Sequence, residues 1–341
     1  MSAHFSRRSL RRGITVATAV ATLATGLAAC GGDSDAATTT DTAATGSVTI
    51  GRLSNGAATE TTLKVSEVKS ISAELPDAIR KSGKLVIGHG ALPSGSAPLD
   101  YVGDDQKTLT GSETDIGRLV AAVLGLKPES RNLTWENLFV GIDSGKVDVA
   151  FSNVTDTEER KEKYEFASYR QDNLAFEVAK SSKWNFDGNY ENLAGKTVDV
   201  NSGTNQERIL LEWQKKLQSE GKKLTVKHFP DSNGTYLALN SGRIDAHFGP
   251  NPTIAYHITQ TAKTPNATRN AGTYSGAGAG LQGLIAATAK KDSGLAKPLA
   301  DAINYLIKNG QYAKWLAVWN LSNEAVAKSE VNPPGLPLDN S

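Results

Sequence analysis

Small polar residues follow two apolar runs that nearly repeat each other along the chain. Residues 144–151 read SGKVDVAF and residues 241–248 read SGRIDAHF, so Asp148 and Asp245 occupy matching places. In each copy the glycine favours the end of a helix and the apolar run favours a buried strand. Ligands of open α/β sheets bind beyond the carboxyl ends of the strands. The first candidates for ligand contacts are therefore the polar residues after the two runs: Ser152, Asn153, Thr155, Gly249 and Asn251.

The repeat has a plainer interpretation, because Gly-x-Val/Ile-Asp is also a common helix-to-strand junction. Other chemistry has little support, since the sequence contains no Gly-x-Ser-x-Gly, His-Glu-x-x-His or P-loop motif. Its histidines are dispersed: His4, His89, His228, His247 and His257. We therefore expect neither a metal nor a cofactor. An enzyme would need a cleft acid with a raised pKa, for which Glu207 and Glu177 are conceivable, but no motif selects one.

The amino terminus predicts export. Four arginines between residues 7 and 12 precede an apolar run, Ile14–Leu27, that is too short to span a bilayer. Leu-Ala-Ala-Cys30 follows and matches the bacterial lipobox, in which the cysteine is lipidated after cleavage. We predict a signal peptide over residues 1–29, a lipid anchor at Cys30 and a flexible linker over residues 30–62. The paired arginines also resemble a twin-arginine signal, so the export route stays open.

Composition excludes several classes of partner. The chain has 37 Lys+Arg against 36 Asp+Glu, so it has no global field that would attract nucleic acid. Cys30 is the single cysteine, so we expect no disulfide in the folded part. No later apolar run is long enough to cross a membrane, so we expect lipid alone to hold the protein on the outer face of the cytoplasmic membrane. Separately, we expect a monomer.

The candidate ligand residues belong to two predicted α/β units. We expect helices over residues 63–81, 116–124, 135–143, 209–217, 235–240, 295–306 and 312–319. We expect strands over residues 84–88, 147–151, 174–179, 198–200, 224–229, 244–248 and 284–288. This order predicts mainly parallel sheets covered on both faces. Lobe 1 would comprise residues 63–182 and 280–325, lobe 2 residues 183–279, and a tail residues 326–341. Two connections, near residues 180–190 and 272–282, would form a hinge.

An ordered series of motifs resembles the amino-acid-type family of bacterial extracytoplasmic solute-binding proteins, the receptors of ABC importers. The motifs are GKLVIG at 83–88, GSETDIG at 111–117, WENL at 135–138, SGKVDV at 144–149, TDTEER at 155–160, LAGKTVDVNSGT at 193–204 and SGRIDA at 241–246. The resemblance implies the type II periplasmic-binding-protein fold, with two α/β lobes, a ligand cleft between them and a two-segment hinge. It also implies an ABC permease as the partner.

The same resemblance implies roles for individual residues. Arg160 would form a bidentate pair with the ligand carboxylate, which suits its planar guanidinium. Ser152, Asn153 and Thr155 would line the same lobe, and the Gly203-Thr204-Asn205 turn would offer backbone N–H groups from the other lobe. The alternatives are a solvated arginine and a plain helix cap. Leu99, Asp100 and Asn251 complete the predicted site.

The sequence departs from the family pattern where ligand identity is decided. Pro250 stands near the place of the usual acid for the ligand's ammonium group, and proline supplies neither charge nor N–H. Residues 96–100 lack the aromatic residues that are common in the first loop. Asp100, Glu113 or Asp156 could replace the missing acid, although for each of them a surface carboxylate is the favoured interpretation. The sequence thus predicts a receptor for a small carboxylate-bearing solute such as an amino acid or a derivative. The alternatives are a cyclic-carboxylate dehydratase and a sensor with the same fold.

Overall fold

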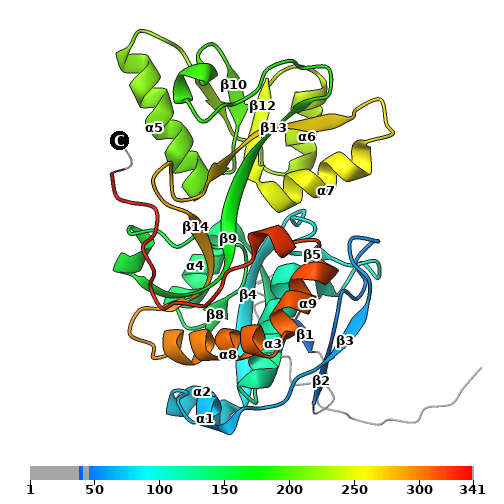
Figure 1. The fold of residues 1–341 in the computed structure, drawn as a ribbon, viewed down its shortest axis with the longest axis vertical. Coiled ribbons are helices and arrows are strands. Elements are labelled where there is room, and N and C mark those ends of the chain that lie inside the picture. Colours follow the sequence, from blue (N-terminus) through cyan, green and yellow to red (C-terminus); the bar gives the residue numbers. More distant parts are fainter. Residues whose placement is uncertain (1–37, 41–45, 340–341) are drawn as a thin grey trace, which may run out of the picture. The chain divides into compact units, whose positions relative to one another are not determined.

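A computed structural model describes residues 38–40 and 46–339 (Figure 1). The predicted signal peptide, Cys30 and part of the predicted linker lie outside the described residues. Within the described part of the chain, no helix is both long and apolar enough to cross a bilayer.

One ten-stranded sheet runs through residues 38–290 and carries the ligand-site candidates. Its order is β1 (Thr38–Thr40), β7 (Lys127–Thr134), β4 (Lys84–Leu92), β8 (Val149–Ala150), β14 (Gly283–Lys290), β9 (Tyr164–Ala179), β12 (Ala246–Pro250), β10 (Thr197–Asp199) and β11 (Thr225–Lys227), with β13 (Thr268–Ser275) also paired to β9. Strand β4 is parallel to β7 and β8, and β10 is parallel to β11 and β12. All pairs made by β9 and β14 are antiparallel. The prediction of mainly parallel sheets therefore holds only for β7, β4 and β8 in lobe 1 and for β12, β10 and β11 in lobe 2, since the edge strand β1 also pairs antiparallel with β7.

Helices cover the sheet in two groups. Lobe 1 has α3 (Ser112–Val123), α4 (Trp135–Asp143), α8 (Ala296–Lys308) and α9 (Gln311–Val318), while lobe 2 has α5 (Asn205–Ser219), α6 (Ser232–Asn240) and α7 (Asn251–Thr261). Shorter elements are α1 (Lys69–Ser72), α2 (Asp77–Ser82), two-residue strands β5 (Tyr101–Val102) and β6 (Leu109–Thr110), and 3-10 turns at Arg160–Glu162, Tyr190–Leu193 and Ser322–Glu324.

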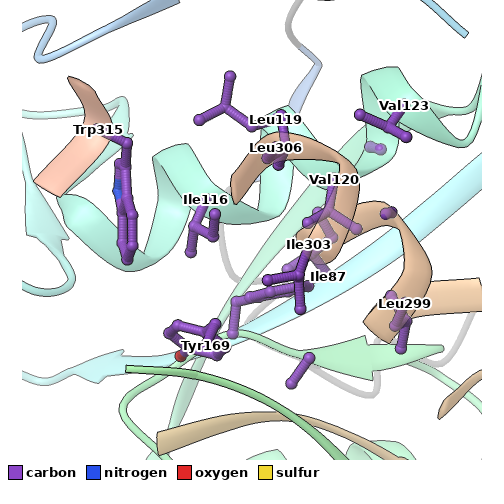
Figure 2. Close-up of a cluster of buried hydrophobic side chains, with 14 of the residues drawn as sticks. Ile87, Ile116, Leu119, Val120, Val123, Tyr169, Leu299, Ile303, Leu306 and Trp315 are labelled. Carbon is purple, nitrogen blue, oxygen red and sulfur yellow. The ribbon is translucent and has the colours of Figure 1, made fainter. Parts of the chain in front are cut away.

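Each lobe has its own hydrophobic core. In lobe 1 the apolar face of α3 packs with α8, as Figure 2 shows for Leu119, Val120 and Ile303, all fully buried. The i, i+3, i+4 spacing of the α3 side chains creates this face, as the sequence predicts. In lobe 2 Phe176 of β9 stacks on Phe248 of β12 with ring centroids 4.3 Å apart. Two separate cores allow the lobes to move as units.

The two sequence repeats are structurally equivalent junctions. The Asp148 carboxylate accepts a hydrogen bond from Val86 N at 2.8 Å, and the Asp245 carboxylate accepts one from Thr197 N at 2.7 Å. In both copies the aspartate N–H donates back to the carbonyl of the same residue. The preceding glycines, Gly145 and Gly242, both have φ of 71°, which glycine adopts at little cost. The repeated aspartates therefore fix neighbouring parallel strands to each other.

The predicted linker is too long. Residues 46–62 are folded, because β2 (Ser47–Ile50) and β3 (Thr61–Lys64) form an antiparallel hairpin. Val48, Ile50 and Leu63 are buried in the lobe 1 core, and Gly51 N donates to Asp115 at 2.7 Å. The prediction failed because few apolar residues stand among many small polar ones. The predicted helix over residues 63–81 is also wrong, since β3, α1 and α2 divide this segment.

The first lobe-to-lobe connection lies earlier than predicted. Strand β9 pairs with β14 over residues 164–172 and with β12 and β13 over residues 173–179, so it crosses at Asp172 and Asn173 and not at residues 180–190. The second crossing lies between β13 and β14, which agrees with the predicted 272–282. The charged run around Arg170 does not resemble a buried strand in sequence, yet Arg170 and Asp172 are 1% and 2% exposed.

Candidate functional site

A cavity of about 550 Å³ lies between residues of the two lobes. The loop after β4, the start of α4 and the end of β8 line it from lobe 1, through residues 90, 92–96, 99–100, 134–136 and 152–153. Residues 201–202, 204–206 and 228–232 and Pro250 line it from lobe 2. Most of these residues follow the carboxyl end of a strand, the place where open α/β sheets bind ligands. Six predicted site residues line this cavity: Leu99, Asp100, Ser152, Asn153, Thr204 and Asn205.

The cavity lining is acidic. It contains Asp100, Glu136 and Asp231, together with His228, and no lysine or arginine among the described residues. Asp100 is held rigidly, because its Oδ1 lies 3.0 Å from His89 Nδ1 and its Oδ2 accepts from Ser152 Oγ at 2.8 Å. A fixed carboxylate that lines a cavity between two lobes favours a cationic ligand group.

Of the three proposed replacements for the missing acid, Asp100 alone lines the cavity. Glu113 is fully buried, pairs with Arg170 at 3.1 Å and accepts from Asn153 N at 2.9 Å. Asp156 is also fully buried, with the Lys161 ammonium 3.3 Å from its Oδ1. Burial raises the pKa of Glu113, and it raises the pKa of Asp156 to about 7 although Lys161 opposes the shift. These two acids face protein partners.

Arg160 lies beside a second cavity of about 370 Å³. Its Nη1 donates to Thr155 O at 2.9 Å, and its Nη2 donates to Gly203 O of lobe 2 at 3.3 Å. Its guanidinium lies over the rings of Trp135 and Phe139, 5.5 and 5.3 Å from their centroids. Burial lowers the pKa of Arg160 to about 10 while Asp172 opposes the shift, so the group stays charged at neutral pH.

The start of α5 forms the wall between the two cavities. Thr204 and Asn205 line both, whereas Gly203 lines the smaller one. Thr204 caps α5, because its side chain accepts from Glu207 N at 3.2 Å. Gly203 has φ of 73°, and its carbonyl also accepts from Trp135 Nε1 at 3.2 Å. Trp135 and Arg160 of lobe 1 thus hold one carbonyl of lobe 2.

Thr155 does not line either cavity. It is 1% exposed, and its hydroxyl donates to Asp172 Oδ2 at 2.7 Å. The same oxygen accepts from Asn205 Nδ2 of lobe 2 at 3.0 Å. Burial raises the pKa of Asp172 to about 6, against the hydrogen bond from Thr155. Asp172 therefore joins one predicted site residue from each lobe at the point where β9 crosses.

Asn153 is the strained residue of the site. Its φ of 52° is left-handed, which is uncommon for a residue other than glycine and occurs often at functional sites. The Arg170 guanidinium donates to its side-chain oxygen and pairs with Glu113 and Glu324. A buried ion network therefore holds Asn153 against the larger cavity. Asn251 lies at the start of α7, half-buried and outside the residues that line either cavity, while its neighbour Pro250 lines the larger one.

The sequence prediction omitted several lining residues. Trp135 and the His228–Ser232 segment line the larger cavity. His228 pairs with Glu207 at 2.6 Å, and the Asp231 side chain caps α6. The rule applied to the repeats would have found His228–Ser232, because this segment follows β11 as the polar residues follow β8.

The comparisons with known proteins agree with this geometry. The family model described as bacterial extracellular solute-binding proteins, family 3, matches residues 91–322. The L-cystine-binding protein TcyJ of Escherichia coli K12 is 30% identical over 246 residues, 71% of this chain and 85% of that protein. The arginine-binding protein ArgT of Corynebacterium glutamicum is 25% identical over 78% of this chain and 83% of its own length.

Solved structures support the same assignment. The amino acid ABC transporter substrate-binding protein AbpA of Streptococcus pneumoniae, bound to L-arginine, is 25% identical with a TM-score of 0.59, covering 73% of this chain and all of its own. An ancestral arginine-binding protein bound to arginine has the same identity and score over 70% of this chain and 98% of its own. The predicted type II periplasmic-binding-protein fold is confirmed. The chain belongs to family 3 of the bacterial extracellular solute-binding proteins.

Proposed function

We propose that this protein is the exported receptor of an ABC importer and captures an amino acid or an amino-acid derivative between its lobes. The cavity of about 550 Å³ carries the proposal, because residues of both lobes line it and a bound solute would be held by both. Closure can be driven only by a ligand that binds the closed form more tightly than the open form. Relatives that bind cystine and arginine support an amino acid as the solute.

The charges beside the cavities support a solute with both a carboxylate and a cationic group. Arg160 at the smaller cavity is the proposed partner of the carboxylate. The neighbouring N-terminus of α5 also favours a negatively charged group. Asp100 in the larger cavity is the proposed partner of the cationic group. It would take over the role of the family's usual acid, near whose place this chain has Pro250. Leu99, Ser152, Asn153 and the Gly203–Asn205 turn would line the site, and Thr155 and Asn251 would adjoin it.

A thermal-shift panel tests the proposed function. We expect L-cystine, L-arginine or a related zwitterion to stabilise the refolded, ligand-stripped protein. At a ligand concentration of 100 Kd the gain is about 2.7 kcal/mol, a shift of several degrees. Plain carboxylates without an ammonium group form the matched control set. Stabilisation by these carboxylates alone would remove Asp100 from its role, and no response to any solute would contradict an amino-acid receptor.

We propose further that Cys30 anchors the receptor to the membrane through lipid, which the lipobox supports. Cys30→Ala should release the exported protein from the membrane fraction, because within residues 38–40 and 46–339 no helix is long and apolar enough to cross a bilayer. Fractionation of cells that express both forms measures this. Retention of the alanine variant in the membrane fraction would contradict a lipid anchor at this cysteine.

The dehydratase alternative gains no specific support. One structural neighbour is an ancestral amino-acid-binding protein described as a precursor of cyclohexadienyl dehydratase, at 24% identity, a likeness that concerns the fold. The two acids considered for catalysis have protein partners. Glu177 is fully buried and accepts hydrogen bonds from His257 and Thr268. Glu207 accepts from Gly203 N and pairs with His228.

A further inference from the structure

The carboxyl-terminal segment, residues 329–339, contacts both lobes and lies beyond the residues that match the family. Figure 1 shows this segment in red, running from the lower lobe to the side of α5 in the upper lobe. We call residues 329–339 the strap. Since none of the family motifs includes it, the family pattern assigns it no role.

The first half of the strap is fixed to lobe 1. Asn332 N donates to Phe166 O at 3.0 Å, and Phe166 N donates back to the Asn332 side chain at 2.8 Å. Glu330 N donates to Ser168 Oγ at 2.9 Å. These bonds use the half of β9 that belongs to lobe 1, so the strap begins as an extension of the lobe 1 sheet.

The middle of the strap pairs with the loop that carries Arg160. Leu336 N donates to Asp156 O at 3.2 Å, and Glu158 N donates to Leu336 O at 3.0 Å. Gly335 fits closely, since a Cβ there would lie 2.6 Å from Asp156 O. Lys161, next to Arg160, donates to Pro333 O. The strap thus restrains the loop on both sides of Glu158.

The end of the strap is fixed to lobe 2. Leu336 is fully buried and belongs to the same hydrophobic cluster as Leu210 and Trp213 of α5. Arg208 of α5 donates to Pro337 O and pairs with Glu159 at 3.3 Å. Leu336 also lines the smaller cavity together with Arg160 and Arg208. Leu336 therefore contacts the loop of lobe 1 through its backbone and the core of lobe 2 through its side chain.

We infer that the strap is a positioning element of the binding site, which holds the Asp156–Arg160 loop of lobe 1 against α5 of lobe 2. It limits how far the lobes separate and keeps the Arg160 guanidinium directed at the start of α5. Opening of the cleft must then remove Leu336 from one of its two surfaces. The limit that the strap sets on lobe separation is independent of the proposed function. Only the effect of the strap on ligand affinity rests on that function.

The distance between the lobes tests the inference without a ligand. Val140 of α4 and Leu237 of α6 are 59% and 66% exposed, so cysteines at these positions can carry spin labels on opposite lobes. The full chain with Cys30→Ser has no other cysteine. We expect electron-electron double resonance to give a narrow distance distribution for this parent protein.

Two variants should change that distribution. Gly335→Val should displace the strap because its side chain would collide with the Asp156 backbone, and Leu336→Ala should remove the buried contact with α5. Both are expected to lengthen the mean distance and at least double the width of the distribution. Leu338→Ala is the matched control, since Leu338 belongs to the same strap and is 65% exposed. Distributions equal to the parent in two variants that remain folded by circular dichroism would overturn the inference.

The rate at which the ligand dissociates is a second test of the strap. We expect dissociation of labelled L-cystine to be at least fivefold faster from Gly335→Val and Leu336→Ala than from the parent or the Leu338→Ala control. Unchanged dissociation rates together with unchanged distances would reject the proposed role of the strap. If the parent protein does not bind L-cystine, the proposed ligand fails while the distance measurement still decides the role of the strap.

Discussion

Replacement of Arg160 by alanine is expected to weaken binding of the solute that stabilises the protein best by at least tenfold. Tenfold corresponds to about 1.4 kcal/mol. The side chain is positioned by Trp135, Phe139 and two carbonyls, one of them from lobe 2. Loss of the guanidinium would remove the proposed carboxylate partner and also one lobe-to-lobe contact. Both effects weaken the closed form more than the open form.

Titration calorimetry measures this effect, and Lys163→Ala supplies the control. Lys163 lines the same cavity, but its side chain is exposed, so its removal changes the charge equally without removing a fixed donor. We expect Lys163→Ala to bind within about twofold of the parent, since exposed charges contribute little. Equal affinity of Arg160→Ala and the parent would remove Arg160 from the binding site.

Replacement of Glu324 by alanine is expected to lower the free energy of unfolding by about 3 kcal/mol. Removing one partner of a buried ion pair leaves the other charge uncompensated. Arg170 is 1% exposed and lies between Glu324 and Glu113, both fully buried. Burial alone would lower the pKa of Arg170, but the two glutamates together raise it. Because Arg170 keeps its pair with Glu113, the expected loss of unfolding free energy lies at the lower end of the range for broken buried ion pairs.

Urea unfolding measures the loss, and Glu330→Ala is the matched control. Glu330 pairs with Lys328 at 2.8 Å on the surface, where its side chain is 44% exposed. Exposed pairs of this kind contribute at most about 1 kcal/mol. Similar losses for Glu324→Ala and Glu330→Ala would show that the buried network contributes no more than a surface pair.

Much of the fold is predictable because regular spacing directly reports burial. The apolar positions of α3 recur at i, i+3 and i+4, and only one face of a helix can satisfy that pattern against a core. The repeats at Asp148 and Asp245 are equally local, since glycine, aspartate and an apolar run together determine the junction. Such features depend on neighbours in sequence, so the sequence alone is sufficient.

Features that depend on distant partners were missed. Arg170 and Asp172 look like surface residues because their compensating groups, Glu324 and Asn205, lie more than thirty positions away. The hairpin of β2 and β3 is stabilised by packing against α3 and α9, which its own composition does not indicate. Strong tertiary contacts can override weak local signals in this way.

The candidate site was predictable in part. Arg160, Thr204 and Asn205 could be placed at strand ends and helix starts from motifs, and the structure brings them to two adjoining cavities. Their separation into two cavities depends on Trp135 and the Gly203 carbonyl, whose contact joins residues 68 positions apart. The strap could not be predicted, because residues 329–339 have neither periodicity nor a motif.

The course of β9 and β14 has a consequence for the order in which the two lobes fold during synthesis. Strand β14 lies between β8 and β9 in the middle of the sheet, and α8 and α9 complete the core of lobe 1. The indole of Trp319 donates to Asp115, 204 positions earlier in sequence. During synthesis from the amino terminus, all residues of lobe 2 are therefore made before the last elements of the lobe 1 core, α8 and α9. Pairings this distant form slowly, so the nascent receptor passes through a stage in which α3 has no partner helix.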